Sequence, residues 1–234
     1  MIDPNKSFNL SYLPYQNRWV ACFDLLGVRQ KTVSEVIPLI AMVIDNVRIS
    51  ARRNKIKYIW LSDTFLLYTD HASEADSVKK FGPIEQTVRQ LLDVLLKREV
   101  VFRGALAFGD FYADEVNHVY AGPALVKAYE CAEAQDWIGY VLSQTALAKL
   151  ETMGVLPEML RQHYRTYEIP IKPGKREKLS NFANGTLPGT RLPALILGAD
   201  FNLKGQQMCS STFDSVNTLK KLKRIQQDEG VIRK

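Results

Sequence analysis

Two aspartates stand alone in apolar stretches of this chain. Asp24 lies in the run FDLLG, and Asp63 lies between the apolar runs 57–61 and 65–68. Burying a lone carboxylate is costly, so we expect a cation to neutralise each of them. Two carboxylates that converge can hold Mg²⁺ or Mn²⁺, which activate an attacking oxygen and neutralise a leaving phosphate. A reading without metal stays open, in which Asp24 caps a turn and Asp63 is a surface residue of a hairpin.

The turn after Asp24 contains Leu25, Leu26 and Gly27. A turn that ends at a glycine can point several backbone N–H groups outward, and these groups can hold phosphate oxygens. The turn and the two aspartates together indicate a metal site that faces a phosphate.

The composition narrows the class of protein. The chain has 234 residues, of which 46% are hydrophobic and 24% are charged, as in a soluble globular protein. No apolar run reaches about 18 residues, so no contact with a membrane is expected. Residues 1–6 lack the order of a signal peptide, and we expect a cytoplasmic protein.

The net charge of +6 is concentrated in residues 48–57 and 220–224. These clusters lack the interleaved aromatic residues of a nucleic-acid-binding surface, which argues against nucleic acid as a partner. A nucleoside triphosphate would benefit from the same positive field. Cys22, Cys131 and Cys209 show no metal-type spacing, so we expect reduced thiols in or near the core.

Strands and helices must position the two aspartates. Apolar runs predict strands at 19–26, 57–61, 65–69, 100–108, 137–142 and 192–197, and helical spacing predicts helices at 32–53, 73–98, 123–133, 143–151 and 211–228. We expect Pro38 to start or kink the first helix and Pro83 to break the second. The segment Lys172–Arg191 is rich in Pro, Gly, Asn and Lys, which predicts a long exposed loop.

This order predicts an α/β (α+β) fold, with an antiparallel or mixed sheet flanked by helices. No internal repeat or linker is visible. We therefore expect a single domain over residues 1–234, with a core at about 19–150 and a C-terminal extension, containing a further strand and helix, at about 151–234.

Four motifs follow one another along the chain: Phe23-Asp24-x-x-Gly27, Ser62-Asp63 in a hairpin, the strand from Arg103 to Gly109, and Gly122 before a helix. Their order resembles a class III nucleotidyl cyclase domain. The resemblance covers Trp19 to Leu147 and implies a ferredoxin-like core that works as a head-to-tail homodimer.

The resemblance also implies the chemistry. Two metal ions, Mg²⁺ or Mn²⁺, activate the ribose 3′-hydroxyl of a nucleoside triphosphate for attack on the α-phosphate, and pyrophosphate leaves. Carried over by position, the metal ligands are Asp24, Leu25 and Asp63. The backbone of Leu25, Leu26 and Gly27 would hold the triphosphate.

The chain departs from the purine cyclases at three places. A base-reading lysine is replaced by Ile59, and the asparagine and arginine of the helix after the glycine are replaced by Val126 and Glu130. An apolar and an anionic side chain cannot stabilise negative charge that develops on phosphate. Either another cation does so, or the protein is not an active cyclase.

These departures are similar to those of the pyrimidine cyclases of Pycsar antiphage systems, which make cyclic UMP or cyclic CMP. That product triggers a separate effector that responds to the cyclic nucleotide. The resemblance implies an aromatic residue that selects the small base, and Tyr58 is the candidate. Arg103 is the expected replacement cation, ahead of Lys127. The alternatives are strand packing for Tyr58, a structural salt bridge for Arg103 and a solvated helix lysine for Lys127.

Three functions remain in competition. The first is metal-dependent cyclisation of UTP or CTP to a 3′,5′-cyclic monophosphate. The second is a catalytically inactive cyclase-like domain that binds nucleotide or dimerises, and the third is a nucleic-acid-binding module. Retention of both aspartates favours the first, whereas the loss of the transition-state residues favours the second.

Overall fold

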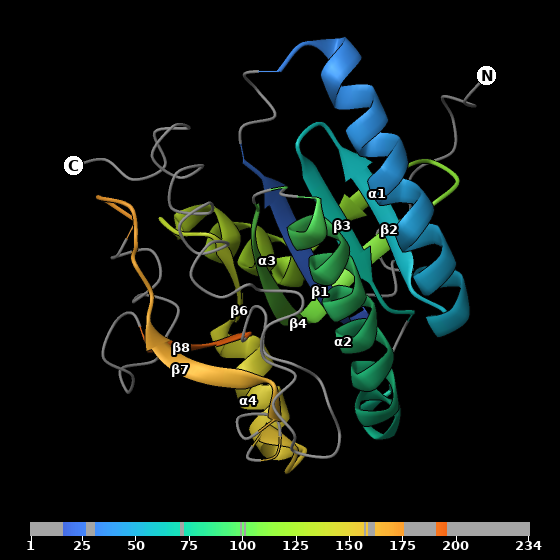
Figure 1. Ribbon diagram of the computed structural model, residues 1–234. Helices are drawn as coiled ribbons and strands as arrows, with labels where there is room; N and C mark the ends of the chain where they lie inside the picture. Colours follow the sequence, from blue (N-terminus) through green and yellow to red (C-terminus); the bar gives the residue numbers. More distant parts are fainter. Residues whose placement is uncertain are drawn as a thin grey trace, which may run out of the picture.

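A computed structural model (Figure 1) describes residues 16–26, 31–70, 73–98, 100, 102–156, 158, 162–175 and 191–195, and all structural statements below concern these residues. Its strands form one mixed sheet in the order β2-β3-β1-β4-β6-β8-β7, with β5 paired to β4. The strands are β1 (Gln16–Leu25), β2 (Lys57–Leu61), β3 (Thr64–Tyr68), β4 (Phe102–Asp114), β5 (Val119–Ala121), β6 (Gly139–Leu142), β7 (Tyr164–Glu168) and β8 (Arg191–Leu195). Strands β4 and β6 are parallel, and every other pairing is antiparallel.

The helices cover the two faces of the sheet. They are α1 (Val33–Asn54), α2 (Glu74–Lys97), α3 (Pro123–Ala134) and α4 (Gln144–Thr152). In Figure 1, α1 and α2 run side by side over one face, and α3 lies behind the sheet. None of the helices among the described residues is long and apolar enough to cross a membrane.

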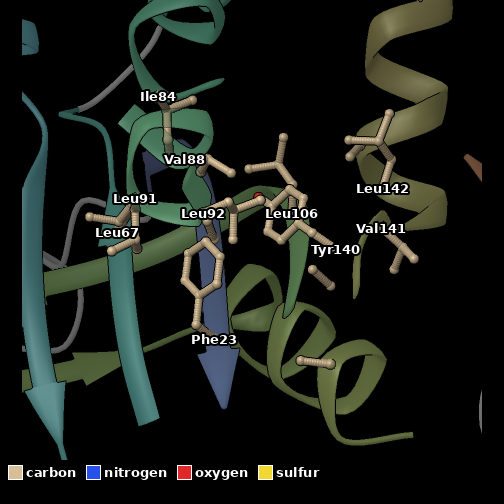
Figure 2. Close-up of a cluster of buried hydrophobic side chains, with 14 of the residues drawn as sticks. Phe23, Leu67, Ile84, Val88, Leu91, Leu92, Leu106, Tyr140, Val141 and Leu142 are labelled. Atoms are coloured by element: carbon tan, nitrogen blue, oxygen red, sulfur yellow. The ribbon is translucent and has the colours of Figure 1, made fainter. Parts of the chain in front are cut away.

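Alternation along β1 assigns its side chains to these two faces, since successive residues of a strand point in opposite directions. Trp19, Ala21 and Phe23 belong to the large core cluster that includes residues of α1 and α2. Val20 and Cys22 belong to a smaller cluster with residues of α3. Figure 2 shows the large cluster, in which Ile84, Val88, Leu91 and Leu92 of α2 gather around Phe23, Leu67 and Tyr140.

Local signals explain where the helices begin. Thr32 and Glu35 form a capping box at the start of α1. The hydroxyls of Ser73 and Ser143 accept hydrogen bonds from the first turns of α2 and α4, as expected of N-cap residues. Gly122, with φ of 138°, turns the chain into α3, which starts with Pro123.

The predicted helix start at Pro38 and the predicted break at Pro83 are wrong, because both prolines lie inside continuous helices. Pro38 lies in the second turn of α1 on an exposed face, where water can satisfy the one carbonyl that loses its partner. Around Pro83, the buried side chains of Phe81 and Ile84 hold both parts of α2 against the sheet.

The fold class is confirmed, with corrections in its second half. Strand β7 was not predicted, and β4 continues past Gly109 to Asp114. Of the predicted loop, residues 172–175 form a turn in which residues 173 and 174 are exposed, and Lys172 N–H donates to the carbonyl of Ala134 at 2.9 Å, whereas Arg191 begins β8. The rest of that loop and the helix predicted at 211–228 lie outside the described residues.

The prediction for the cysteines holds where the structure describes them. Cys22 and Cys131 are buried free thiols, and burial raises the pKa of Cys131 to about 12. A thiol with such a pKa stays protonated at neutral pH and is unreactive. Cys209 lies outside the described residues.

Candidate active site

Asp24 lies near the end of β1, between two neighbouring strands. Its Cα is in register with Thr64 on β3 and with Arg103 on β4. Residues in register share a face of the sheet, and Cys22, two residues before Asp24, packs on the α3 face. Asp24 and Arg103 therefore both point to the α3 face.

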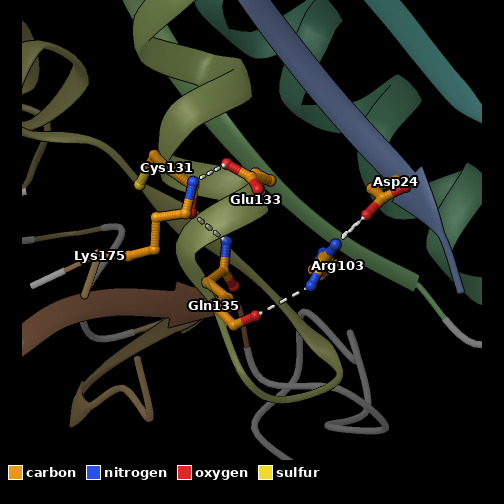
Figure 3. Close-up of polar contacts among 6 residues, drawn as sticks. All are labelled: Asp24, Arg103, Cys131, Glu133, Gln135 and Lys175. Carbon is orange, nitrogen blue, oxygen red and sulfur yellow. Dashed lines mark hydrogen bonds and ion pairs between the residues drawn. The ribbon is translucent and has the colours of Figure 1, made fainter. Parts of the chain in front are cut away.

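Arg103 is the cation that neutralises Asp24. Its Nε donates to Oδ2 of Asp24 at 2.8 Å, its Nη2 contacts the same oxygen, and its Nη1 donates to the carbonyl of Gln135 at 3.2 Å (Figure 3). The side chains of Asp24 and Arg103 are only 15% and 11% exposed. A nearly buried, charge-assisted pair of this kind fixes the orientation of both side chains.

Asp63 is held against the end of β1. It follows Ser62 in the tight turn between β2 and β3, where Ser62 has a left-handed φ of 58°. The carbonyl of Asp63 accepts a hydrogen bond from the N–H of Leu25 at 2.9 Å, and the residue is 7% exposed. The sequence-predicted residues Asp24, Leu25 and Asp63 thus lie together, with Leu26 next in the chain. Gly27 lies outside the described residues.

The donor set suits a hard divalent cation. Among the described residues there is no group of three or more His, Cys, Asp and Glu side chains that could hold a metal ion. The candidate ligands are therefore the carboxylates of Asp24 and Asp63 and the backbone carbonyl of Leu25. Mg²⁺ is commonly held by one or two carboxylates, with water and substrate phosphates completing its shell. These residues fit such an ion.

The structure does not bring Tyr58 to this site. Its ring packs against Phe65 with centroids 6.3 Å apart and contacts the core cluster of the α1 and α2 face. The neighbouring residues Ile59 and Leu61 point to the α3 face, where Ile59 packs on the small cluster and Leu61 lines a pocket. A role of Tyr58 in choosing the base stays a prediction, although its position favours the alternative of strand packing.

The two residues of α3 that differ from purine cyclases, Val126 and Glu130, both line that pocket, which has a volume of about 460 Å³. Val126 and Glu130 line one wall, and Leu61 and Leu66 of the hairpin line the opposite wall. Thr64, the register partner of Asp24, also lines it. Two of the three positions at which this chain differs from purine cyclases therefore face the hairpin that carries Asp63.

Lys172 is a candidate residue that the sequence reasoning missed. It is half-buried, and its pKa is lowered by burial and by the Arg103 guanidinium, while Glu133 and Asp24 act in the opposite direction. Lys172 thus lies close enough to both members of the Asp24–Arg103 pair to feel their charge. Its neighbour Lys175 is bound to Glu133 at 2.9 Å (Figure 3). The two lysines flank a Pro-Gly pair, which is a sequence signal for a turn. That turn places both lysines near α3.

Comparisons with known proteins agree with this geometry at the level of the fold. No protein-family profile and no curated protein matches the sequence. The catalytic core of a rhodopsin-guanylyl cyclase with converted specificity, in complex with ATPαS, matches with a TM-score of 0.55 and 10% identity over 78% of this chain and 97% of that chain.

Two further structures match in the same way. The non-canonical dimeric guanylyl cyclase domain of the RhoGC fusion protein from the aquatic fungus Blastocladiella emersonii has a TM-score of 0.53 and 10% identity over 78% of this chain and 97% of that chain. Adenylate cyclases from Trypanosoma brucei, in their monomeric state, match with a TM-score of 0.52 and 13% identity over 79% of this chain and 89% of that chain. The chain therefore has the fold of class III adenylyl and guanylyl cyclase domains.

Proposed function

We propose that this protein is a nucleotidyl cyclase that converts UTP or CTP to the 3′,5′-cyclic monophosphate and pyrophosphate. The observation that carries the proposal is the meeting of Asp24 and Asp63 at the ends of adjacent strands, within a fold shared with class III cyclases. Two carboxylates at one end of a sheet can share a divalent cation with the phosphates of a substrate.

The proposed reaction is a single displacement at the α-phosphorus, in which each residue of the site has a separate role. The new bond joins the ribose O3′ to the α-phosphorus, and the bond from that phosphorus to the bridging oxygen of pyrophosphate breaks. When bound at Asp24, Leu25 and Asp63, Mg²⁺ or Mn²⁺ supplies charge neutralisation at the phosphates and acidifies the 3′-hydroxyl. Arg103 orients the carboxylate of Asp24, and Lys172 places a second cation beside the pair to receive phosphate oxygens.

The pyrimidine substrate, the homodimer and the role in antiphage signalling extend the proposal. Ile59 and Val126 leave no polar side chain at places where purine cyclases have a lysine and an asparagine. The pocket beside the aspartates is open at its rim, where Leu61 and Val126 are exposed, as expected if a second subunit completes the site. The cyclic nucleotide would then act on a separate effector protein.

A catalytically inactive cyclase-like domain is the second candidate. The ion pair favours it, because the guanidinium of Arg103 already occupies Oδ2 of Asp24. Under this reading, the pair is structural, and the domain binds a nucleotide or a second subunit without turnover.

The test is an assay of the purified protein with ATP, GTP, CTP and UTP in the presence of Mn²⁺, following cyclic nucleotide and pyrophosphate. We expect one pyrimidine triphosphate to be cyclised and Asp63→Asn to lower turnover by at least about 100-fold. The matched control is Asp45→Asn, which removes an exposed carboxylate of α1. Nucleotide binding without any product would overturn the proposal in favour of the inactive domain.

A further inference from the structure

The pocket beside the two aspartates has the dimensions and walls of a site for a flat organic ligand. Its volume of about 460 Å³ falls in the range of small-molecule sites. Its apolar walls come from two elements, with Leu61 and Leu66 on the hairpin and Leu125, Val126 and Tyr129 on α3. Apolar walls of this kind exclude water from the faces of a planar ring.

The carboxylate of Glu130 lies among these apolar side chains. Glu130 lines the pocket, and its Oε2 is buried without a hydrogen bond from any residue that the structure describes. The other carboxylate of the lining, Glu133, is held by Lys175 at 2.9 Å. Of the two carboxylates in the described lining, Glu130 is therefore the one left for a ligand, and a buried polar atom is costly while it lacks a partner.

Two lysines lie near Glu130. Lys127 on α3 and Lys175 on the turn after β7 lie close enough to Glu130 to feel its charge. The larger effect on Lys127 is burial, which lowers its pKa, and Lys175 is bonded to Glu133. An ionised carboxylate accepts hydrogen bonds but cannot donate them.

We propose that Glu130 reads the exocyclic amino group of cytosine, so that the substrate is CTP rather than UTP. The 4-amino group of cytosine is a donor, whereas uracil has a carbonyl acceptor at the same place. The carboxylate of Glu130 can accept a hydrogen bond from the cytosine amino group but not from the uracil carbonyl. A site that leaves a buried polar group unpaired with the wrong substrate discriminates strongly against that substrate. This inference rests on the proposed function, because it takes the pocket next to Asp24 and Asp63 as the site of the base.

The test measures binding, so that it does not depend on turnover. The probes are the non-cleavable α,β-methylene analogues of CTP and UTP, titrated calorimetrically into the full chain with Mg²⁺. We expect the cytidine analogue to bind about 10- to 100-fold more tightly than the uridine analogue. In Glu130→Gln the amide can donate to the uracil carbonyl, so this preference should fall to within about threefold.

The matched control is Glu133→Gln, which makes the same change of charge on α3 at a carboxylate already bound by Lys175. It should keep the ratio of the two affinities. Equal affinities in the wild type, or an unchanged ratio in Glu130→Gln, would overturn the inference. A preserved preference for the cytidine analogue in a protein that cyclises nothing would instead refute the proposed function and leave the role of Glu130 standing.

Discussion

The two faces of the central sheet differ in how far apolar side chains fill them. On the face of α1 and α2, large apolar side chains fill one continuous core (Figure 2). On the face of α3, the apolar cluster is small, and beyond it lie the Asp24–Arg103 pair, the pocket and Glu130. The first face supplies most of the apolar packing, and the second holds the polar side chains of the candidate site.

This contrast has a direct consequence for mutations. A residue on the packed face should act mainly on the free energy of unfolding. A residue on the α3 face should act mainly on binding and turnover, because the hairpin and α3 leave a pocket between them. The predictions below test that separation.

The largest effect on stability is expected at Leu92. This side chain is 2% exposed in the core cluster, so Leu92→Ala should lower the free energy of unfolding by about 4 kcal/mol. The matched truncation on the other face is Leu61→Ala, at a side chain that is 53% exposed. It should change that free energy by less than about 0.5 kcal/mol. Urea denaturation of both variants measures the difference, and similar losses would contradict the separation of the faces.

The next effect is expected at Arg103, where the α3 face does affect folding. Arg103→Met leaves the nearly buried carboxylate of Asp24 without its cation and should cost about 3 kcal/mol in unfolding free energy, together with most of the turnover. The double variant Asp24→Asn with Arg103→Met should regain much of the stability and none of the activity. Arg48→Met, which breaks the exposed pair with Asp45, is the control and should cost less than about 0.5 kcal/mol.

The sequence could predict the fold class and the need for a cation beside Asp24, but not the position of Lys172 or the orientation of Tyr58. The need for a cation beside Asp24 followed from the cost of burying a charge, and Arg103 supplies it. The fold class followed from the alternation of strand and helix patterns. Lys172 could not be placed, because only the pairing of its segment with residue 134 brings it to the site. The orientation of Tyr58 depends on the strand register, since a shift of one residue exchanges the faces.

A smaller effect should follow from pH on the packed face. Burial raises the pKa of Glu85 to about 7, although Arg89 lies 2.8 Å from its carboxylate. Because the pKa is higher in the folded protein than in the unfolded chain, this group's contribution to stability is full below about pH 4.5. It is lost as the pH rises through about 7, on the order of 2 kcal/mol. Unfolding free energies at about pH 5 and about pH 8 should show this loss in the wild type. In Glu85→Gln the loss should be absent, and an equal loss there would assign the pH dependence to another group.

The smallest effect is expected at Tyr58, and it decides between two hypotheses for the choice of base. If its ring selects the base, Tyr58→Ala should change the ratio of kcat/KM values for CTP, UTP and ATP. Because the ring packs on Phe65 and the core of the α1 and α2 face, we expect instead a loss of about 1 kcal/mol in unfolding free energy with these ratios unchanged. Tyr58→Phe, which keeps the ring, should retain both the stability and the ratios. A changed ratio in Tyr58→Ala at intact stability would restore the sequence-based hypothesis and place a base contact on the packed face.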